Sequence, residues 1–97
     1  MEKGHYVYIL LTENNTLYCG YADDVEKRFT QHVEGKGAKY TRANKPVKIV
    51  YQKKFDTKSE ALKEEYRIKH KLTREAKLEL IESQNSSFIL GSRNFYL

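Results

Sequence analysis

Apolar and polar positions alternate with periods that predict three strands and three helices. Residues 5–11 are rich in β-branched and aromatic side chains, which predicts a strand that is buried on both faces. Residues 12–15 are turn-forming, and residues 16–20 predict the returning strand of a hairpin. Residues 47–51 predict a third strand, directly after the only proline.

The register of this hairpin decides which side chains share a face of the sheet. A three-residue loop with Asn15 in the left-handed conformation pairs residues whose numbers have an even sum. Tyr8 then faces Gly20, and Leu10 faces Tyr18. Tyr8 and Tyr18 would lie on the same face, whereas an odd sum would separate them. We predict the even-sum register.

The first helix is predicted after Asp23, which is a suitable N-cap with Glu26 closing a capping box. Val25, Phe29 and Val33 recur every four residues and predict its buried stripe. The glycines at positions 35 and 37 end the helix. A basic loop is expected over residues 36–46.

Two more helices are predicted in the second half of the chain. Thr57 and Glu60 form a capping box for a helix over residues 57–71. Thr73 begins the next helix, whose inward side chains are Ala76, Leu80 and Ile81. Residues 83–87 are expected to form a loop, and residues 88–97 an apolar tail.

The resulting order, β-β-α-β-α-α, predicts an α+β fold with a small three-stranded antiparallel sheet flanked by helices. A chain of 97 residues has room for one small core. We therefore expect one domain, residues 1–82, followed by a C-terminal apolar tail, residues 83–97. No apolar stretch approaches the roughly 18 residues that cross a bilayer. The single cysteine and the lack of a signal-peptide pattern favour a cytoplasmic location and no membrane partner.

Positive charge is concentrated in the middle of the chain, whose net charge is +5. Residues 1–34 sum to −3, whereas residues 35–54 contain seven basic side chains and no acidic one. A basic stretch without interleaved acids favours a polyanionic partner such as nucleic acid. A solvated loop of a basic protein is the alternative interpretation. The candidate nucleic-acid contacts in this stretch are Lys36, Lys39, Arg42 and Lys45.

Glu65 is the clearest physical anomaly of the sequence. On a helical wheel it falls near the middle of the apolar face formed by Ala61, Leu62, Ile68 and Leu72. A carboxylate in such a place costs several kcal/mol unless it is paired or bound to a metal ion. The wheel alone favours an ordinary ion pair, for example with an arginine of the first helix.

Other candidate side chains are individually weak signals. Arg28 and His32, four residues apart, share one side of the first helix, as many solvated pairs do. Four of the eight tyrosines cluster on the predicted hairpin, where they serve as core filler, as stacking platforms or as acid–base groups. The histidines and Cys19 have no zinc-binding spacing, and Cys19 is expected to be a small buried side chain.

Five segments, taken in order, resemble the GIY-YIG nuclease superfamily, and the resemblance covers residues 5–81. Two short motifs lie on the hairpin, at Tyr6-Val7-Tyr8 and Tyr18-Cys19-Gly20. The segments that follow are residues 24–29, 35–42 and 61–66. They look like the small stand-alone bacterial members (YhbQ-like) and are similar to the catalytic subunits of branched-DNA resolvases. One departure is Tyr6, which stands where the first motif usually has glycine.

The resemblance implies a role for each matching residue. The catalytic residues would be Tyr8, Tyr18, Arg28, His32 and Glu65, with Gly20 as a glycine that permits close approach. Glu65 would hold one Mg²⁺ or Mn²⁺ ion, so the family points to the same carboxylate as the helical wheel. Tyr8 would accept a proton from the attacking water, provided that Arg28 and the metal lower its pKa from about 10.

The expected function is therefore metal-dependent cleavage of DNA phosphodiester bonds, structure-specific in repair or recombination and acting on branched or single-strand-containing DNA. Two other classes stay open. One is a nucleic-acid-binding module without significant cleavage. The other is an interaction domain that uses residues 88–97 to contact a protein partner or a second copy.

Overall fold

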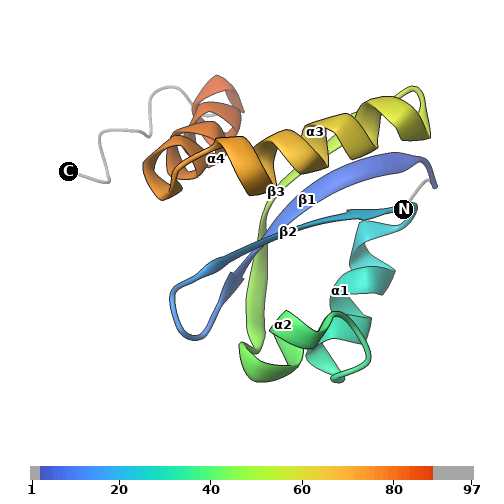
Figure 1. Ribbon diagram of the computed structural model, residues 1–97, viewed down its shortest axis with the longest axis vertical. Coiled ribbons are helices and arrows are strands. Elements are labelled where there is room, and N and C mark those ends of the chain that lie inside the picture. The colour runs from blue at the N-terminus through green and yellow to red at the C-terminus, as the bar shows by residue number, and fades with distance from the viewer. Residues whose placement is uncertain (1–2, 89–97) are drawn as a thin grey trace.

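An antiparallel sheet separates two groups of helices (Figure 1). The computed structural model describes residues 3–88. The elements in chain order are β1 (His5–Thr12), β2 (Leu17–Ala22), α1 (Val25–Val33), α2 (Lys39–Ala43), β3 (Pro46–Phe55), α3 (Lys58–Lys71) and α4 (Arg74–Phe88). The strand order is β2-β1-β3, so the most apolar strand, β1, is central. The predicted α+β fold is confirmed, with α2 as one helix more than expected.

The β1–β2 hairpin has the predicted register. Asn15 has a φ of 60°, the left-handed conformation that the three-residue loop requires. Tyr8 pairs with Gly20, and Leu10 pairs with Tyr18. Tyr8 and Tyr18 therefore share a face of the sheet, and this face is where α1 packs.

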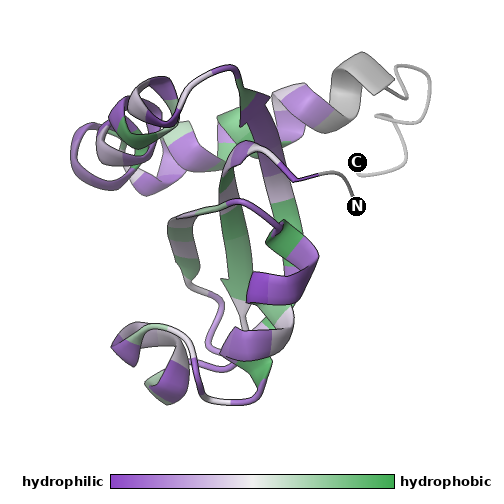
Figure 2. Ribbon diagram, turned by 90° about the vertical axis from the view of Figure 1, so that its right-hand side faces the viewer, coloured by the Kyte–Doolittle hydropathy of each residue, from purple (hydrophilic) through white to green (hydrophobic). Residues whose placement is uncertain are grey.

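The two faces of the sheet bury different sets of side chains. One face and α3 enclose an apolar core made of Val7, Ile9, Cys19, Tyr51, Ala61 and Ile68. The other face and α1 enclose a smaller core made of Tyr8, Leu10, Ala22 and Val25. Figure 2 shows the apolar strands running between helices whose outer surfaces are largely polar.

A bulge in β3 allows neighbouring residues of this strand to pack in the cores on both faces of the sheet. Ile9 pairs with Tyr51 and Leu10 pairs with Ile49, which leaves Val50 as an extra residue on β3. Because of this extra residue, Tyr51 packs in the α3-side core while Ile49 packs against the α1-side core.

Helix α1 differs from the prediction at both ends. The N-cap is Asp24, whose side chain accepts a hydrogen bond from the Lys27 backbone N–H, so the predicted cap at Asp23 is wrong by one residue. Val33 is 38% exposed, whereas His32 is 2% exposed. The buried stripe is therefore rotated toward His32, because α2 covers that side of α1.

Two segments predicted as loops are helical. Within residues 36–46, Lys39–Ala43 form α2 and Pro46 already belongs to β3. The predicted loop at 83–87 is wrong, because α4 continues to Phe88. The Gln84 side chain explains part of this: it donates to the Gln52 carbonyl and accepts from the Gln52 N–H, binding α4 to β3. The remainder of the predicted tail lies outside the described residues, and the predicted boundary between domain and tail stays a prediction.

Helix α3 begins as predicted, with the Thr57 hydroxyl accepting from the Glu60 N–H. Ala61 and Ile68 are buried, but Leu62 is 40% exposed and does not belong to the apolar face. Thr73 likewise caps α4 by accepting from the Ala76 N–H. None of the helices within residues 3–88 has the length and apolar character needed to cross a membrane.

Candidate active site

A chain of hydrogen bonds connects the Tyr8 phenol to α2 through His32. The Tyr8 hydroxyl lies 2.9 Å from Nε2 of His32. On the other side of the imidazole, Nδ1 lies 2.6 Å from the Thr41 Oγ1. Tyr8, His32 and Thr41 are each no more than 2% exposed, so these bonds are shielded from water.

The hydrogen bonds of Thr41 determine which imidazole nitrogen carries the proton. Oγ1 of Thr41 donates its only proton to the Ala38 carbonyl, at 2.9 Å. The hydroxyl must then accept from His32, so Nδ1 is protonated and Nε2 is free to accept the Tyr8 proton. The Ala38 N–H also points at Nδ1, but at 3.4 Å this contact is the weaker one, and it cannot coexist with a protonated Nδ1.

Two glycines make room for this chain. A Cβ on Gly20 would lie 2.6 Å from Cζ of Tyr8, and a Cβ on Gly37 would lie 2.7 Å from Cε1 of His32. Either contact is far inside van der Waals distance. The glycine of the second motif therefore admits the phenol of Tyr8, and Gly37 lets the loop before α2 pass directly over the imidazole.

Tyr18 lies between groups from three elements. Its ring stacks on Tyr40 of α2, with centroids 5.9 Å apart and an interplanar angle of 19°. The edge contact with His32 has a centroid distance of 5.2 Å. The Lys69 ammonium lies 5.6 Å from the centroid of the Tyr18 ring. Contacts from α1, α2 and α3 thus surround the Tyr18 ring and fix its orientation.

Glu65 reaches this cluster from α3. Its carboxylate pairs with Lys69 one turn later, at 3.2 Å, and the side chain is 19% exposed. Glu65 therefore forms an ion pair, as the helical wheel alone favoured, but with Lys69 of its own helix and not with an arginine of the first helix. Burial is the largest cause of the raised pKa of Tyr8 and of Tyr18, and the charge of Glu65 adds to both, which indicates that the carboxylate lies near the two phenols.

Glu64 is a useful contrast to its neighbour. It forms two hydrogen bonds to Arg67, at 2.8 and 2.7 Å, and is equally exposed at 19%. These hydrogen bonds lower the pKa of Glu64. Its charge adds to the burial that raises the pKa of Tyr51, and both Glu64 and Glu65 add to the raised pKa of Cys19 in the α3-side core. Glu65 also adds to the raised pKa of Tyr8 and Tyr18 on the other face of the sheet.

Burial dominates the acidity of Tyr8. Desolvation raises the pKa of Tyr8 well above 10, and the neighbouring Tyr18 and Glu65 add to the increase. The charge of Arg28 and its hydrogen bond to Tyr8 lower that pKa, as expected, but they do not outweigh burial. The expected net lowering by Arg28 is therefore not observed in the protein alone. For His32, burial and the charge of Arg28 lower the pKa, so the imidazole is neutral at pH 7.

The donor set for a metal ion is small. Among the described residues there is no cluster of three histidine, cysteine or acidic side chains. A single carboxylate, Glu65, suits Mg²⁺ or Mn²⁺, which keep several waters and complete their coordination with substrate phosphate. Cys19 is unsuited to metal or nucleophilic chemistry, because burial raises its pKa to about 12.

The structure brings all five predicted catalytic residues together, on β1, β2, α1 and α3. The predicted nucleic-acid contacts Lys36, Lys39, Arg42 and Lys45 are exposed on and around α2. Thr41, Tyr40, Gly37 and Lys69 also belong to the site, and the sequence analysis assigned them no role. For Gly37, Tyr40 and Thr41 the signal was the segment 35–42, which matched the family pattern but was interpreted as a basic loop. Lys69 lies on α3, four residues after Glu65.

A hairpin that places two tyrosines beside an arginine of one helix and a glutamate of another agrees with the resemblance noted in the sequence. Residues 4–79 match the family model described as the GIY-YIG catalytic domain. The chain belongs to the GIY-YIG family.

Its relatives are small bacterial proteins. The UPF0213 protein SSP2268 of Staphylococcus saprophyticus is 56% identical over 81 residues, which cover 84% of this chain and 96% of the relative. The UPF0213 protein OB0043 of Oceanobacillus iheyensis is 54% identical over 84 residues, covering 87% and 96%. The solution structure of EF2693 from E. faecalis is similar, with a TM-score of 0.60, 40% identity, and coverage of 88% of this chain and 92% of that one. The solution structure of the UPF0213 protein BH0048 from Bacillus halodurans is also similar, with a TM-score of 0.53 and 45% identity. The match covers 80% of this chain and 82% of that one.

Proposed function

We propose that this protein is an endonuclease that hydrolyses DNA phosphodiester bonds with one divalent metal ion. The observation that supports this most is the position of Glu65. Its partner Lys69 lies over the Tyr18 ring, and the charge of Glu65 adds to the burial that raises the pKa of Tyr8 and of Tyr18. Its equally exposed neighbour, Glu64, is instead held by two hydrogen bonds from Arg67.

Arg28 would bind the non-bridging oxygens of the scissile phosphate. It lies close enough to Tyr8 to hydrogen-bond to it, so the phosphate would be held next to the phenol. A guanidinium matches two phosphate oxygens and stabilises the charge that accumulates on them during attack.

Tyr8 and His32 would remove the proton of the attacking water together. Tyr8 alone is a poor base, because burial raises its pKa. As the water transfers a proton to the Tyr8 oxygen, the phenol transfers its own proton to Nε2 of His32, which is held free by Thr41. The hydroxide attacks phosphorus, the bond to the leaving sugar oxygen breaks, and the proton stays on the imidazole until it returns to solvent.

Glu65 would hold the metal ion, which supplies charge neutralisation at the phosphate and at the leaving oxygen. For this, Glu65 must release Lys69. The Lys69 side chain is 38% exposed and can move away. In the paired arrangement its ammonium already lies near Tyr18, and after release it would be available to contact a second phosphate.

The exposed basic side chains around α2 would follow the DNA backbone. Lys36, Lys39, Arg42 and Lys45 supply charge without a base-reading element, so recognition would depend on DNA shape rather than sequence. This supports a structure-specific role in DNA repair or recombination. Binding should weaken steeply with salt.

A cleavage panel with matched variants tests the proposal. The parent, Glu65→Ala and Glu64→Ala would be assayed on single-stranded, duplex, flap and four-way DNA, with Mg²⁺ or Mn²⁺. We expect Glu65→Ala to lower cleavage by about a thousand-fold or more while DNA binding stays within about two-fold. Glu64→Ala should cleave as the parent does, after correction for any loss of stability.

Equal cleavage by the parent and by Glu65→Ala would exclude this mechanism. Metal-independent binding by the parent with no cleavage of any substrate would favour the second candidate, a nucleic-acid-binding module. That candidate is kept because the basic segment around α2 can bind DNA without any contribution from Glu65.

A further inference from the structure

One side of α3 faces the open edge of the sheet. The Lys58 ammonium lies 5.8 Å from the centroid of the Tyr21 ring, and the Lys69 ammonium lies over the Tyr18 ring. Both tyrosines belong to β2, which is an edge strand. This side of α3 therefore borders β2 along its length, and Glu65 lies on it between the two lysines.

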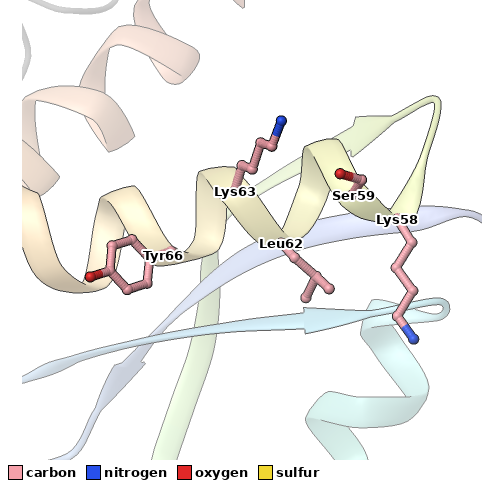
Figure 3. A pocket seen from close by; sticks show the side chains of 5 residues that line it. All are labelled: Lys58, Ser59, Leu62, Lys63 and Tyr66. Carbon is pink, nitrogen blue, oxygen red and sulfur yellow. The ribbon is translucent and has the colours of Figure 1, made fainter.

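A shallow groove continues from this side onto the outer surface of α3. It has a volume of about 590 Å³ and is open to solvent along the helix. It is lined by Lys58, Ser59, Leu62, Lys63 and Tyr66. Figure 3 shows Leu62 and Lys58 pointing toward β2, with Lys63 and Ser59 on the opposite flank of the helix.

The lining combines an exposed aromatic ring with positive charge. Leu62 is 40% exposed and Tyr66 is 57% exposed, and both line the same groove. The Tyr66 ring contacts His70, with ring centroids 4.4 Å apart and an interplanar angle of 40°, and more than half of the residue stays exposed. Two lysines line the groove, and no acidic side chain does.

We infer that this groove binds an unpaired nucleic-acid strand, with a base stacked on Tyr66 and phosphates held by Lys58 and Lys63. The inference rests on the proposed function. It implies that the DNA substrate contains a single-stranded segment next to the bond that is cleaved. Tyr66 directly follows Glu65 in α3, so a strand in the groove passes the candidate metal ligand within one helical turn.

Charge and geometry favour a nucleic-acid strand over a protein partner. Base stacking on an exposed tyrosine with nearby cations is the general mode of single-strand binding, and it tolerates any sequence. Bases of a duplex are already stacked on each other, so only unpaired nucleotides can use Tyr66. A protein partner that covers Leu62 and Tyr66 would instead bind without dependence on nucleic acid, and this is an outcome that the test can detect.

The test measures binding in EDTA, where metal-dependent cleavage is absent. The probe is an oligothymidine strand with one 2-aminopurine, whose fluorescence is quenched when the base stacks. We expect quenching by the parent and by Tyr66→Phe. Tyr66→Ala should lose the quenching and bind the strand about ten-fold more weakly, while duplex binding stays within two-fold. Leu78→Ala is the control, because Leu78 is a 43% exposed side chain on α4.

The lysines have a separate signature. Replacing Lys58 and Lys63 by glutamine should make the salt dependence of strand binding shallower by about 0.7 per lost phosphate contact. Unchanged affinity, quenching and salt dependence in these variants would overturn the inference, even if the parent cleaves DNA. Conversely, quenching by Tyr66 without any metal-dependent cleavage would overturn the proposed function and leave the strand-binding groove intact.

Discussion

Alternate residues of β1 point to opposite faces of the sheet, and the two faces differ in polarity. Val7 and Ile9 are fully buried against α3 in an apolar core. Tyr8 is equally buried on the other face, but its hydroxyl continues into a chain of hydrogen bonds. Both faces exclude water, yet only one uses that exclusion to position protons.

This difference indicates how a domain of this size combines stability with a site. The α3-side core needs only volume and shape, since burial of apolar surface stabilises the fold without directional contacts. The α1-side core contains a phenol, an imidazole and a hydroxyl, each of which would destabilise the fold if left without a partner. Their mutual hydrogen bonds satisfy that requirement and fix the site in one arrangement.

The comparison is tested most strongly by Tyr8→Phe. Removing the hydroxyl takes away the group that receives the water proton, so cleavage should fall by about 10²–10⁴-fold. Nε2 of His32 is left without a donor, which should lower the free energy of unfolding by about 1–3 kcal/mol. Single-turnover cleavage and urea unfolding measure the two effects.

Ile9→Ala is the matched substitution on the other face, since Ile9 is the next residue and is also fully buried. Loss of packing should lower the free energy of unfolding by about 2–5 kcal/mol, more than Tyr8→Phe does. The rate per folded molecule should stay within about three-fold of the parent. If Ile9→Ala and Tyr8→Phe reduce cleavage equally, the functional separation of the two faces is wrong.

A smaller effect is expected at Thr41. Thr41→Val preserves the shape of the side chain but removes the acceptor for Nδ1 of His32. The Ala38 N–H, already 3.4 Å from Nδ1, can then donate to it, and the proton moves to Nε2. Nε2 would no longer accept from Tyr8, and cleavage should fall about ten-fold, equivalent to about 1.4 kcal/mol of activation free energy.

The tautomer itself can be measured, independently of activity. Nitrogen NMR of the His32 ring should show Nδ1 protonated in the parent and in Thr41→Ser, and Nε2 protonated in Thr41→Val. A parent with the proton on Nε2 would contradict the assignment made from the Thr41 hydrogen bonds. Cleavage by Thr41→Ser should stay close to that of the parent.

The hairpin and its tyrosines were predictable because local chemistry decides them. Asn15 tolerates the left-handed conformation, and the loop length then fixes the pairing of Tyr8 with Gly20. Glu65 was recognisable because a carboxylate near an apolar stripe is costly. The wheel placed it in the middle of an apolar face, whereas Glu65 and Glu64 are equally exposed at 19% and Leu62 is 40% exposed, so both glutamates lie at the margin of that face. The wheel also could not identify Lys69 as the partner, because it does not show which pairs form.

The surroundings of His32 were not predictable from periodicity. Its burial depends on α2, a five-residue helix that is too short to give a periodic signal. If α2 is not taken into account, the periodicity of α1 predicts that Val33 is buried and does not predict that His32 is. Gly37 shows the same limit, because its close approach to the imidazole is a tertiary contact, whereas in the sequence it is typical of a helix end.

The pH dependence of stability gives the smallest expected effect, and it also distinguishes the two faces. Burial and the charge of Arg28 lower the pKa of His32 below its ordinary value of 6.5. As the pH falls below about 6.5, the unfolded chain takes up a proton that the folded imidazole does not, so stability is lost by up to about 1.4 kcal/mol per pH unit until the folded pKa is reached. Above about pH 6.5 this contribution is fully present.

Urea unfolding of the parent and of His32→Gln from about pH 7.5 to about pH 5 should show their stability difference shrinking on acidification. Ile9→Ala should run parallel to the parent, because the apolar face has no such group. Parallel curves for His32→Gln and the parent would mean that His32 is as accessible to protons in the fold as in the unfolded chain.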